Sequence, residues 1–174
     1  WEEQFSGGNR TKKVKKILIT SDLYLPSVNG VVTSITNLVG ELRKRNYDVR
    51  ILSTSNDTHY HYDETEKVYY MQSIPFNIYP GVRMPLNYVK HEFLKDLVEW
   101  KPDIIHSQCE FFSFEYAKKI SKKTGAPIIH TYHTLYGQYI SYLPFSSVMA
   151  NTEKMIGMAS QIRLNDANTI IAPT

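Results

Sequence analysis

Short apolar runs, rich in β-branched residues, recur along this chain and have the length of buried strands. They do not alternate between apolar and polar positions, which indicates strands that are covered on both faces. The predicted strands span residues 16–21, 48–54, 68–74, 103–107, 127–131 and 168–172.

Between these runs the apolar residues recur at helical spacing. Val32, Ile35, Val39 and Leu42 fall on one face of a predicted helix, and Asn46 can close it. The same spacing predicts helices over 86–100, 114–123 and 149–165, whereas the polar stretch 55–67 is predicted to be a loop. Strands separated by helices predict an α/β domain, a Rossmann-like parallel sheet with helices on both faces.

Composition excludes several classes of protein. The 174 residues are 42% hydrophobic and 21% charged, as in globular proteins, so wholesale disorder is excluded. The mean hydropathy is −0.35, and no apolar run approaches the roughly 20 residues of a spanning helix. The single cysteine, Cys109, cannot form an internal disulfide and therefore favours a reducing compartment.

The two ends of the chain look unlike the middle. Residues 1–14 are polar and are interpreted as a tail or a remnant of expression, which leaves a domain over 15–174. The last predicted strand has no closing helix after it, so we expect that a second domain has been cut away.

Three polar clusters follow the first, fourth and fifth predicted strands. Because ligands bind outside the carboxyl ends of such strands, the clusters predict one shared cleft. The candidate cleft residues are Asp22, Tyr24, His106, Gln108, Glu110, Tyr132 and Tyr136.

Asn29 and Gly30 lead directly into the first helix. A helix N-terminus with a glycine can seat a phosphate, because its N–H groups are available and no Cβ blocks the approach. The alternative is an ordinary turn before a helix. The dinucleotide fingerprint and the P-loop are both absent, which disfavours a nicotinamide or flavin cofactor.

His133 is the candidate catalytic residue, because it follows an apolar strand and lies among threonines and tyrosines. A structural histidine is the alternative, and that is how we interpret His130. No paired metal-ligand spacing and no Asp-x-Asp motif occur, so no metal is expected. Cys109 is interpreted as a plain buried thiol rather than a nucleophile.

Aromatic residues alternate with cations over residues 75–95, and lysines cluster over 118–123. Such surfaces suit an anionic bilayer, although a solvated helix face is the alternative. The candidate membrane-surface residues are Arg83, Lys90, Lys118, Lys119, Lys122 and Lys123. The net charge of +3 is small and no sequence motif of a nucleic-acid-binding domain occurs, so no nucleic acid is expected as a partner.

Four motifs occur in order: DLYLPSVNGV at 22–31, HSQCEF at 106–111, HTYHT at 130–134 and IAPT at 171–174. Together they resemble family 4 glycosyltransferases, over residues 15–174. Within that family the chain is most similar to bacterial members that glucosylate the 3-hydroxyl of 1,2-diacylglycerol.

The resemblance implies a GT-B fold, in which two Rossmann-like domains face each other across a cleft. This chain would be the N-terminal, acceptor-binding half, and the C-terminal donor-binding domain would be absent. Gly30 would approach the donor diphosphate and His133 would face the donor sugar near its reacting carbon. Gln108 and Glu110 would be acceptor-side or structural residues. The reaction would need no metal and no cofactor beyond its nucleotide-sugar donor.

The implied activity is transfer of glucose from UDP-glucose to diacylglycerol, with the α-linkage retained, to form a membrane glycolipid. The enzyme would be cytoplasmic and peripheral, on the inner face of the membrane, and this chain alone would be inactive. One alternative is a family member with another acceptor, such as phosphatidylinositol or a soluble sugar. The other is a non-catalytic membrane-binding or ligand-binding module. Two features differ from the family pattern, namely Cys109 and the segment 149–165.

Overall fold

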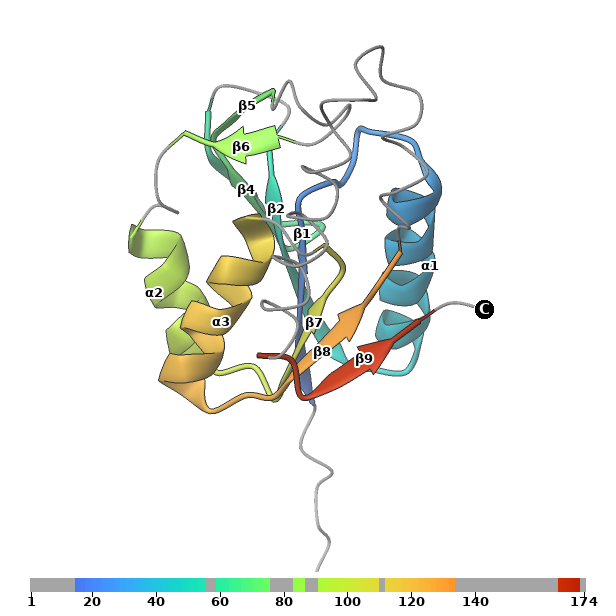
Figure 1. Cartoon of the computed structure of the whole chain (residues 1–174), viewed down its shortest axis with the longest axis vertical. Helices are drawn as coiled ribbons and strands as arrows, with labels where there is room; N and C mark the ends of the chain where they lie inside the picture. Colours follow the sequence, from blue (N-terminus) through green and yellow to red (C-terminus); the bar gives the residue numbers. More distant parts are fainter. Residues whose placement is uncertain are drawn as a thin grey trace, which may run out of the picture.

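The computed structural model describes residues 15–55, 59–75, 83–86, 91–109, 112–133 and 166–172 (Figure 1). Within these ranges, β1 (Lys16–Ser21), α1 (Gly30–Lys44), β2 (Asp48–Thr54), β3 (His61–Asp63) and β4 (Val68–Met71) come first. They are followed by β5 (Ser73–Pro75), β6 (Arg83–Pro85), α2 (His91–Trp100), β7 (Ile104–Ser107), α3 (Phe112–Thr124), β8 (Ile128–Thr131) and β9 (Thr169–Ile171).

The main sheet has the strand order β3-β4-β2-β1-β7-β8-β9. All neighbouring strands pair in parallel except β3, which pairs antiparallel with β4 at the edge. Without β3, this is the 3-2-1-4-5-6 order of a doubly wound domain, and the order reverses between β1 and β7. The predicted Rossmann-like α/β fold is therefore confirmed.

Two apolar cores cover the two faces of the sheet. Ile19 and Ile51 pack with Ile35 of α1 on one face. On the other face, Leu18 and Leu52 pack with residues of α2 and α3. Figure 1 accordingly shows α1 on one side of the sheet and α2 with α3 on the other. Successive residues of each central strand thus feed opposite cores, which explains the unbroken apolar runs.

The start and end of α1 follow from single residues. The side chain of Asn29 accepts a hydrogen bond from the Val32 N–H at 2.9 Å, which caps the helix. Arg43 and Lys44 lie in the last turn, where cations meet the negative end of the helix dipole. Asn46 then adopts a positive φ of 61°, and the chain leaves the helix there.

Three predicted element boundaries were wrong. The expected loop at 55–67 contains β3, and the expected strand at 68–74 divides into β4 and β5. The expected helix at 86–100 begins at His91 instead, because Leu86 continues the β5–β6 hairpin by donating its N–H to the Gln72 carbonyl at 3.0 Å. The predicted helix at 149–165 lies outside the described residues. No helix in the described ranges is long and apolar enough to cross a membrane.

Candidate functional site

The carboxyl ends of β1, β7 and β8 lie side by side at the point where the strand order reverses. The backbone continues this arrangement past the strands, since the Gln108 N–H donates to the Thr20 carbonyl at 2.8 Å. The end of β7 and the residues after β7 and β8 bring His106, Gln108, Tyr132 and His133 to this edge. Glu110 and Tyr136, also predicted for the cleft, lie outside the described residues.

His133 and Gln108 form a hydrogen-bonded pair across the gap between the two strand ends. The Nε2 atom of His133 lies 2.5 Å from Oε1 of Gln108. An amide oxygen can only accept a hydrogen bond, so Nε2 carries the proton and donates a hydrogen bond to Gln108. In a neutral ring, Nδ1 then holds the lone pair. His133 can therefore accept a hydrogen bond from a ligand hydroxyl through Nδ1.

Burial keeps this histidine neutral near pH 7. The His133 ring is half-buried, and this burial lowers its pKa below the ordinary value. Gln108 is only 3% exposed, and its amide nitrogen has no hydrogen-bond partner among the described residues. A buried side chain of this kind has little freedom to move, so it holds the imidazole in one orientation.

Gln108→Glu is expected to raise the pKa of His133 above its ordinary value, by about one pH unit or more. The new carboxylate would lie against Nε2 and favour the imidazolium form. Titration of the His133 ring by NMR measures this shift. Gln108→Leu is the control, because it removes the acceptor without adding charge. An unchanged titration in Gln108→Glu would contradict the pairing.

A second pair lies beside the first. His106 Nε2 and Thr131 Oγ1 are 2.7 Å apart. Burial, together with the nearby His133, lowers the pKa of His106 to about 4. The two pairs, 106 with 131 and 108 with 133, share a separation of 25 residues and are therefore successive contacts between the same two segments. Sequence reasoning missed Thr131, which only this shared register would have revealed.

Asp22 and Tyr24 occupy closed positions. The Asp22 side chain is fully buried, and its Oδ1 accepts the Ser113 N–H of α3 at 2.8 Å. Its carbonyl accepts a hydrogen bond from Thr54 Oγ1 at 2.6 Å. Tyr24 is 4% exposed and belongs to the core under α1. Both residues therefore fix the loop after β1, a structural role that the sequence analysis did not assign to them.

Gly30 begins α1 and leaves open space in front of the helix. A Cβ built on Gly30 would meet nothing within 4 Å, so packing within the domain does not require a glycine there. The side chain of Asn29 is used by the cap, and the Asn29 carbonyl accepts the Thr33 N–H at 2.9 Å. The N–H groups of Gly30 and Val31 therefore remain for an incoming anion.

Cys109 is buried, and its sulfur lies 3.4 Å from Ser21 Oγ. This is the environment of a packed thiol, as expected. In the described part of the chain, no three His, Cys, Asp or Glu side chains are grouped so that they could hold a metal. The expectation that the reaction needs no metal stays a prediction.

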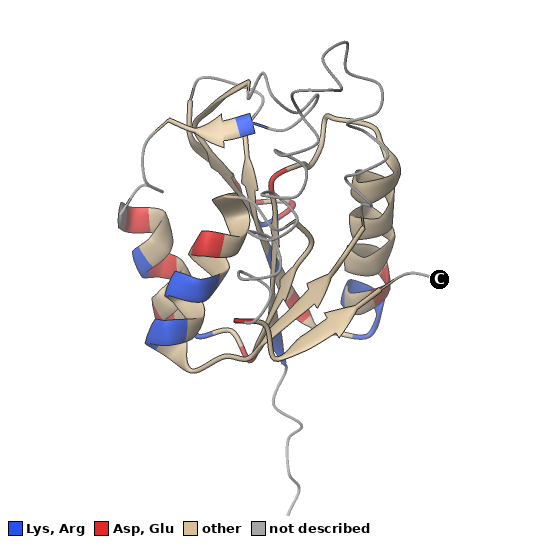
Figure 2. Cartoon of the chain, viewed as in Figure 1, with Lys and Arg blue, Asp and Glu red and all other residues tan. Residues whose placement is uncertain are grey.

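The predicted membrane-surface residues differ in their surroundings. Arg83 donates three hydrogen bonds to Ser55 and Ser73, so it holds the β5–β6 hairpin to the end of β2. Lys118 pairs with Glu115 and Asp166, each at 3.1 Å. Lys119, Lys122 and Lys123 are exposed on α3, where Figure 2 shows basic residues along the helix. Lys90 lies outside the described residues.

Comparison with known proteins gives one family. The model of Glycosyltransferase Family 4 matches residues 28–174. An alpha-monoglucosyldiacylglycerol synthase of Streptococcus pneumoniae (strain ATCC BAA-255 / R6) is 30% identical over 91% of this chain. A protein of the same name from Acholeplasma laidlawii is 29% identical over 74% of it. A GDP-mannose-dependent alpha-mannosyltransferase of Mycobacterium tuberculosis (strain CDC 1551 / Oshkosh) is 23% identical over 68%.

The chain spans about a third of the length of these relatives, since the matches cover 35%, 32% and 32% of them. The matched part contains all the residues described above at the carboxyl edge of β7 and β8.

Proposed function

Because the chain belongs to glycosyltransferase family 4, we propose that it is the acceptor-binding half of a retaining GT-B enzyme. The whole enzyme would transfer glucose from UDP-glucose to diacylglycerol. The choice of diacylglycerol as the acceptor rests on one observation, the 30% identity over 91% of this chain to a protein named for monoglucosyldiacylglycerol synthesis. The arrangement at the carboxyl edge supports the chemistry.

The donor would bind between Gly30 and His133. The start of α1 follows β1, whereas His133 follows β8, two strands away in the sheet. Neighbouring strands are about 4.8 Å apart, so β1 and β8, the strands that lead to these two positions, are on the order of 10 Å apart in the sheet. The diphosphate would meet the N–H groups and positive dipole end of α1, and the attached sugar would reach the His133–Gln108 pair.

His133 would orient the sugar and stabilise charge near the reacting carbon. Because its Nε2–H donates a hydrogen bond to Gln108, the ring would accept a hydrogen bond from a sugar hydroxyl through Nδ1 and fix the position of that hydroxyl. A neutral imidazole suits this role, and burial favours the neutral form by lowering the pKa of His133.

Retention of the α-linkage would not require a carboxylate nucleophile from this domain. A retaining glycosidase places such a carboxylate beside the sugar. Asp22, the first residue of the loop after β1, is fully buried and accepts the N–H of Ser113. As the resemblance to the family implies, the acceptor hydroxyl would attack from the side of the leaving diphosphate, whose oxygen would take the hydroxyl proton.

A lipid acceptor places the enzyme at a membrane surface. The exposed lysines of α3 would face anionic headgroups at the inner leaflet, and the enzyme would lie on the membrane without spanning it. The missing partner would be the donor-binding domain of the same protein, so the 174-residue chain alone is expected not to transfer glucose.

The proposal is tested by incubating the parent protein with labelled UDP-glucose and diacylglycerol in anionic vesicles. A labelled α-glucosyl lipid supports it. Slow hydrolysis of UDP-glucose without a glycolipid would retain the transferase and discard the lipid acceptor. If neither UDP-glucose nor GDP-mannose is turned over, the remaining interpretation is a non-catalytic membrane-binding or ligand-binding module. GDP-mannose belongs in the test because one relative is named for that donor.

Gly30→Ala is expected to raise the KM for UDP-glucose at least about tenfold and to leave the fold intact. The added methyl group meets no protein atom, so its effect arises only if a ligand approaches the helix start. Gly40→Ala is the matched control, because its Cβ also meets nothing within 4 Å and it lies in the same helix. Equal KM values for the two variants would contradict a donor site at Gly30.

A further inference from the structure

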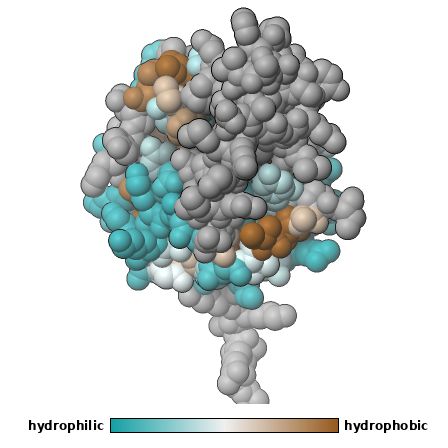
Figure 3. Space-filling model, in the orientation of Figure 1, coloured by the Kyte–Doolittle hydropathy of each residue, from teal (hydrophilic) through white to brown (hydrophobic). Residues whose placement is uncertain are grey.

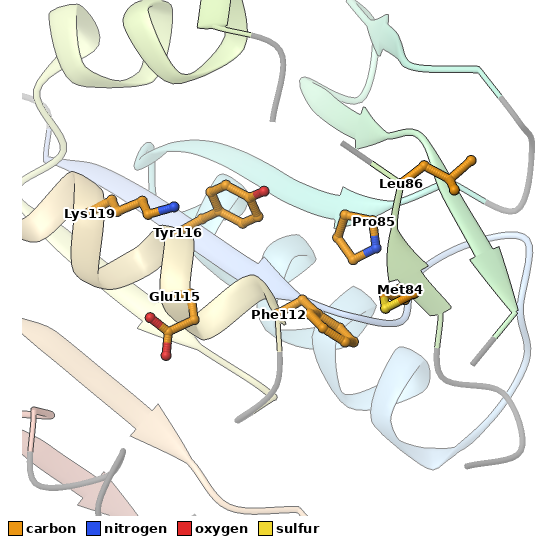
Figure 4. A pocket seen from close by; sticks show the side chains of 7 residues that line it. All are labelled: Met84, Pro85, Leu86, Phe112, Glu115, Tyr116 and Lys119. Carbon is orange, nitrogen blue, oxygen red and sulfur yellow. The ribbon is translucent and has the colours of Figure 1, made fainter. Parts of the chain in front are cut away.

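A cavity of about 460 Å³ opens between β6 and α3 (Figure 4). One wall consists of Met84, Pro85 and Leu86, from β6 and the residue after it. The facing wall is the first half of α3, with Phe112 and Tyr116. The volume lies in the range of small-molecule sites. None of the roles described above uses this cavity.

The chemistry of the two walls differs. The β6 wall is entirely apolar, whereas the α3 wall ends in the ammonium group of Lys119 and the hydroxyl of Tyr116. Figure 4 shows Phe112 directed toward Met84, with the Glu115 carboxylate pointing away from the β6 wall. Glu115 instead pairs with Lys118 at 3.1 Å. An occupant of this cavity is therefore mostly hydrocarbon, with oxygen atoms on its α3 side.

The surroundings of the cavity favour a lipid over a soluble apolar compound. Figure 3 shows a hydrophobic patch over the β5–β6 hairpin, next to the hydrophilic surface of α2 and α3. Leu86 is 42% exposed at the mouth of the cavity. Exposed lysines follow along α3 from this mouth, at positions 119, 122 and 123. An exposed apolar patch bordered by cations matches the boundary between acyl chains and anionic headgroups.

The cavity also lies close to the site. Phe112 is four residues beyond Gln108, which limits the separation of their Cα atoms to about 14 Å. The first turn of α3 is tied to the loop after β1 through the hydrogen bond from Ser113 to Asp22. The start of α3, which forms part of the cavity wall, therefore lies near the His133–Gln108 pair.

We propose that the cavity between β6 and α3 binds one acyl chain of the lipid acceptor, with the ester oxygens toward Lys119 and Tyr116. The proposal rests on the proposed function, because a lipid must be the acceptor. It adds the place where the acceptor is held and the part of the acceptor that is recognised. The cavity would thus contribute to selection of a diacylated acceptor over a soluble sugar.

The test is a chain-length series. In the parent protein, the KM for water-soluble diacylglycerols, from dibutyryl to dioctanoyl, is expected to fall about fourfold for each methylene group that enters the cavity. Leu86→Asp places a charge at the mouth and is expected to reduce this dependence to less than twofold. Hydrolysis of UDP-glucose without acceptor is expected to stay unchanged in Leu86→Asp, since the donor site lies elsewhere.

Ile171→Asp is the matched control. Ile171 is 45% exposed, close to the value for Leu86, but lies on β9 at the opposite edge of the sheet from β3. This variant is expected to keep the fourfold dependence. The proposed acyl site would be overturned if the KM of Leu86→Asp still depended fourfold on chain length. It would also be overturned if the KM of the unmodified protein did not depend on chain length. Failure to glucosylate any diacylglycerol would overturn the proposed function itself, and it would be evident before any variant is made.

A second measurement does not depend on the folding of a variant. Dioctanoylglycerol that carries a diazirine at the end of one chain is crosslinked to the unmodified parent protein by light. Label on peptides that contain residues 84–86 or 112–119 supports the proposal. Label confined to other peptides overturns it.

Discussion

His133→Ala is expected to reduce glucosyl transfer by the parent protein about a hundredfold or more. Removal of one preorganised group that stabilises charge in the transition state typically costs a factor of about 10² to 10³. Here the imidazole is set in one orientation by Gln108 at 2.5 Å, so alanine removes both the group and its alignment. Measurement of kcat and of the KM for UDP-glucose should show a loss that falls mainly in kcat.

The same substitution at His61 is the control. His61 stacks on Tyr70, with ring centroids 4.5 Å apart, in the antiparallel edge strand β3. That strand is several positions away from β7 and β8 in the sheet, so His61→Ala is expected to keep its turnover. Thermal unfolding of both variants separates loss of activity from loss of fold. Retention of more than a tenth of the activity in His133→Ala would exclude a catalytic role for this residue.

The gathering of polar residues at one edge of the sheet was predictable from the topology, whereas the pairing among them was not. Apolar runs and helical spacing predict parallel strands, and parallel strands place His106, Gln108 and His133 at one edge. Which of them touch depends on the register of β7 against β8, where Ile105 lies opposite Ile128. Packing of the side chains of both strands against the two cores sets that register, and the sequence of one strand alone does not contain it.

The β5–β6 hairpin shows a different limit. Pro85 lies at the end of β6, and proline inside a short apolar segment argues against a strand. The hairpin forms because Arg83 donates its hydrogen bonds to Ser55 and Ser73, which come from two other segments. The cavity between β6 and α3 was unpredictable for the same reason, since one of its walls is formed by β6 and the residue after it.

Acidification is expected to destabilise this domain between about pH 6.5 and pH 4, and His130 is the main reason. His130 is fully buried, packs against Phe114 at 5.5 Å between ring centroids, and neither ring nitrogen has a hydrogen-bond partner in the described part of the chain. Burial, together with the neighbouring His106 and His133, lowers its pKa to about 4. Folding therefore keeps the His130 ring in its neutral form and out of contact with solvent.

The sign of the effect follows from this lowered pKa. An unfolded chain protonates its histidines near pH 6.5, whereas the folded chain accepts a proton on His130 only near pH 4. Stability is therefore complete above pH 6.5 and decreases as the pH falls toward 4. The loss approaches about 3 kcal/mol for His130, and His106, whose pKa is also about 4, adds a similar amount. Domains of this size are stable by only about 5–15 kcal/mol, so the two histidines together remove a large part of that margin.

His130→Leu is expected to weaken this acid sensitivity and to leave stability near pH 7.5 within about 1 kcal/mol of the unmodified chain. A buried imidazole without partners loses no hydrogen bond when an apolar side chain of similar size replaces it. Urea unfolding of the two proteins at several pH values measures the difference, which should grow from near zero at pH 7.5 to about 3 kcal/mol at pH 4. Parallel pH profiles for the two proteins would show that His130 takes up its proton equally readily in the folded and the unfolded chain. The acid sensitivity would then have to arise from His106.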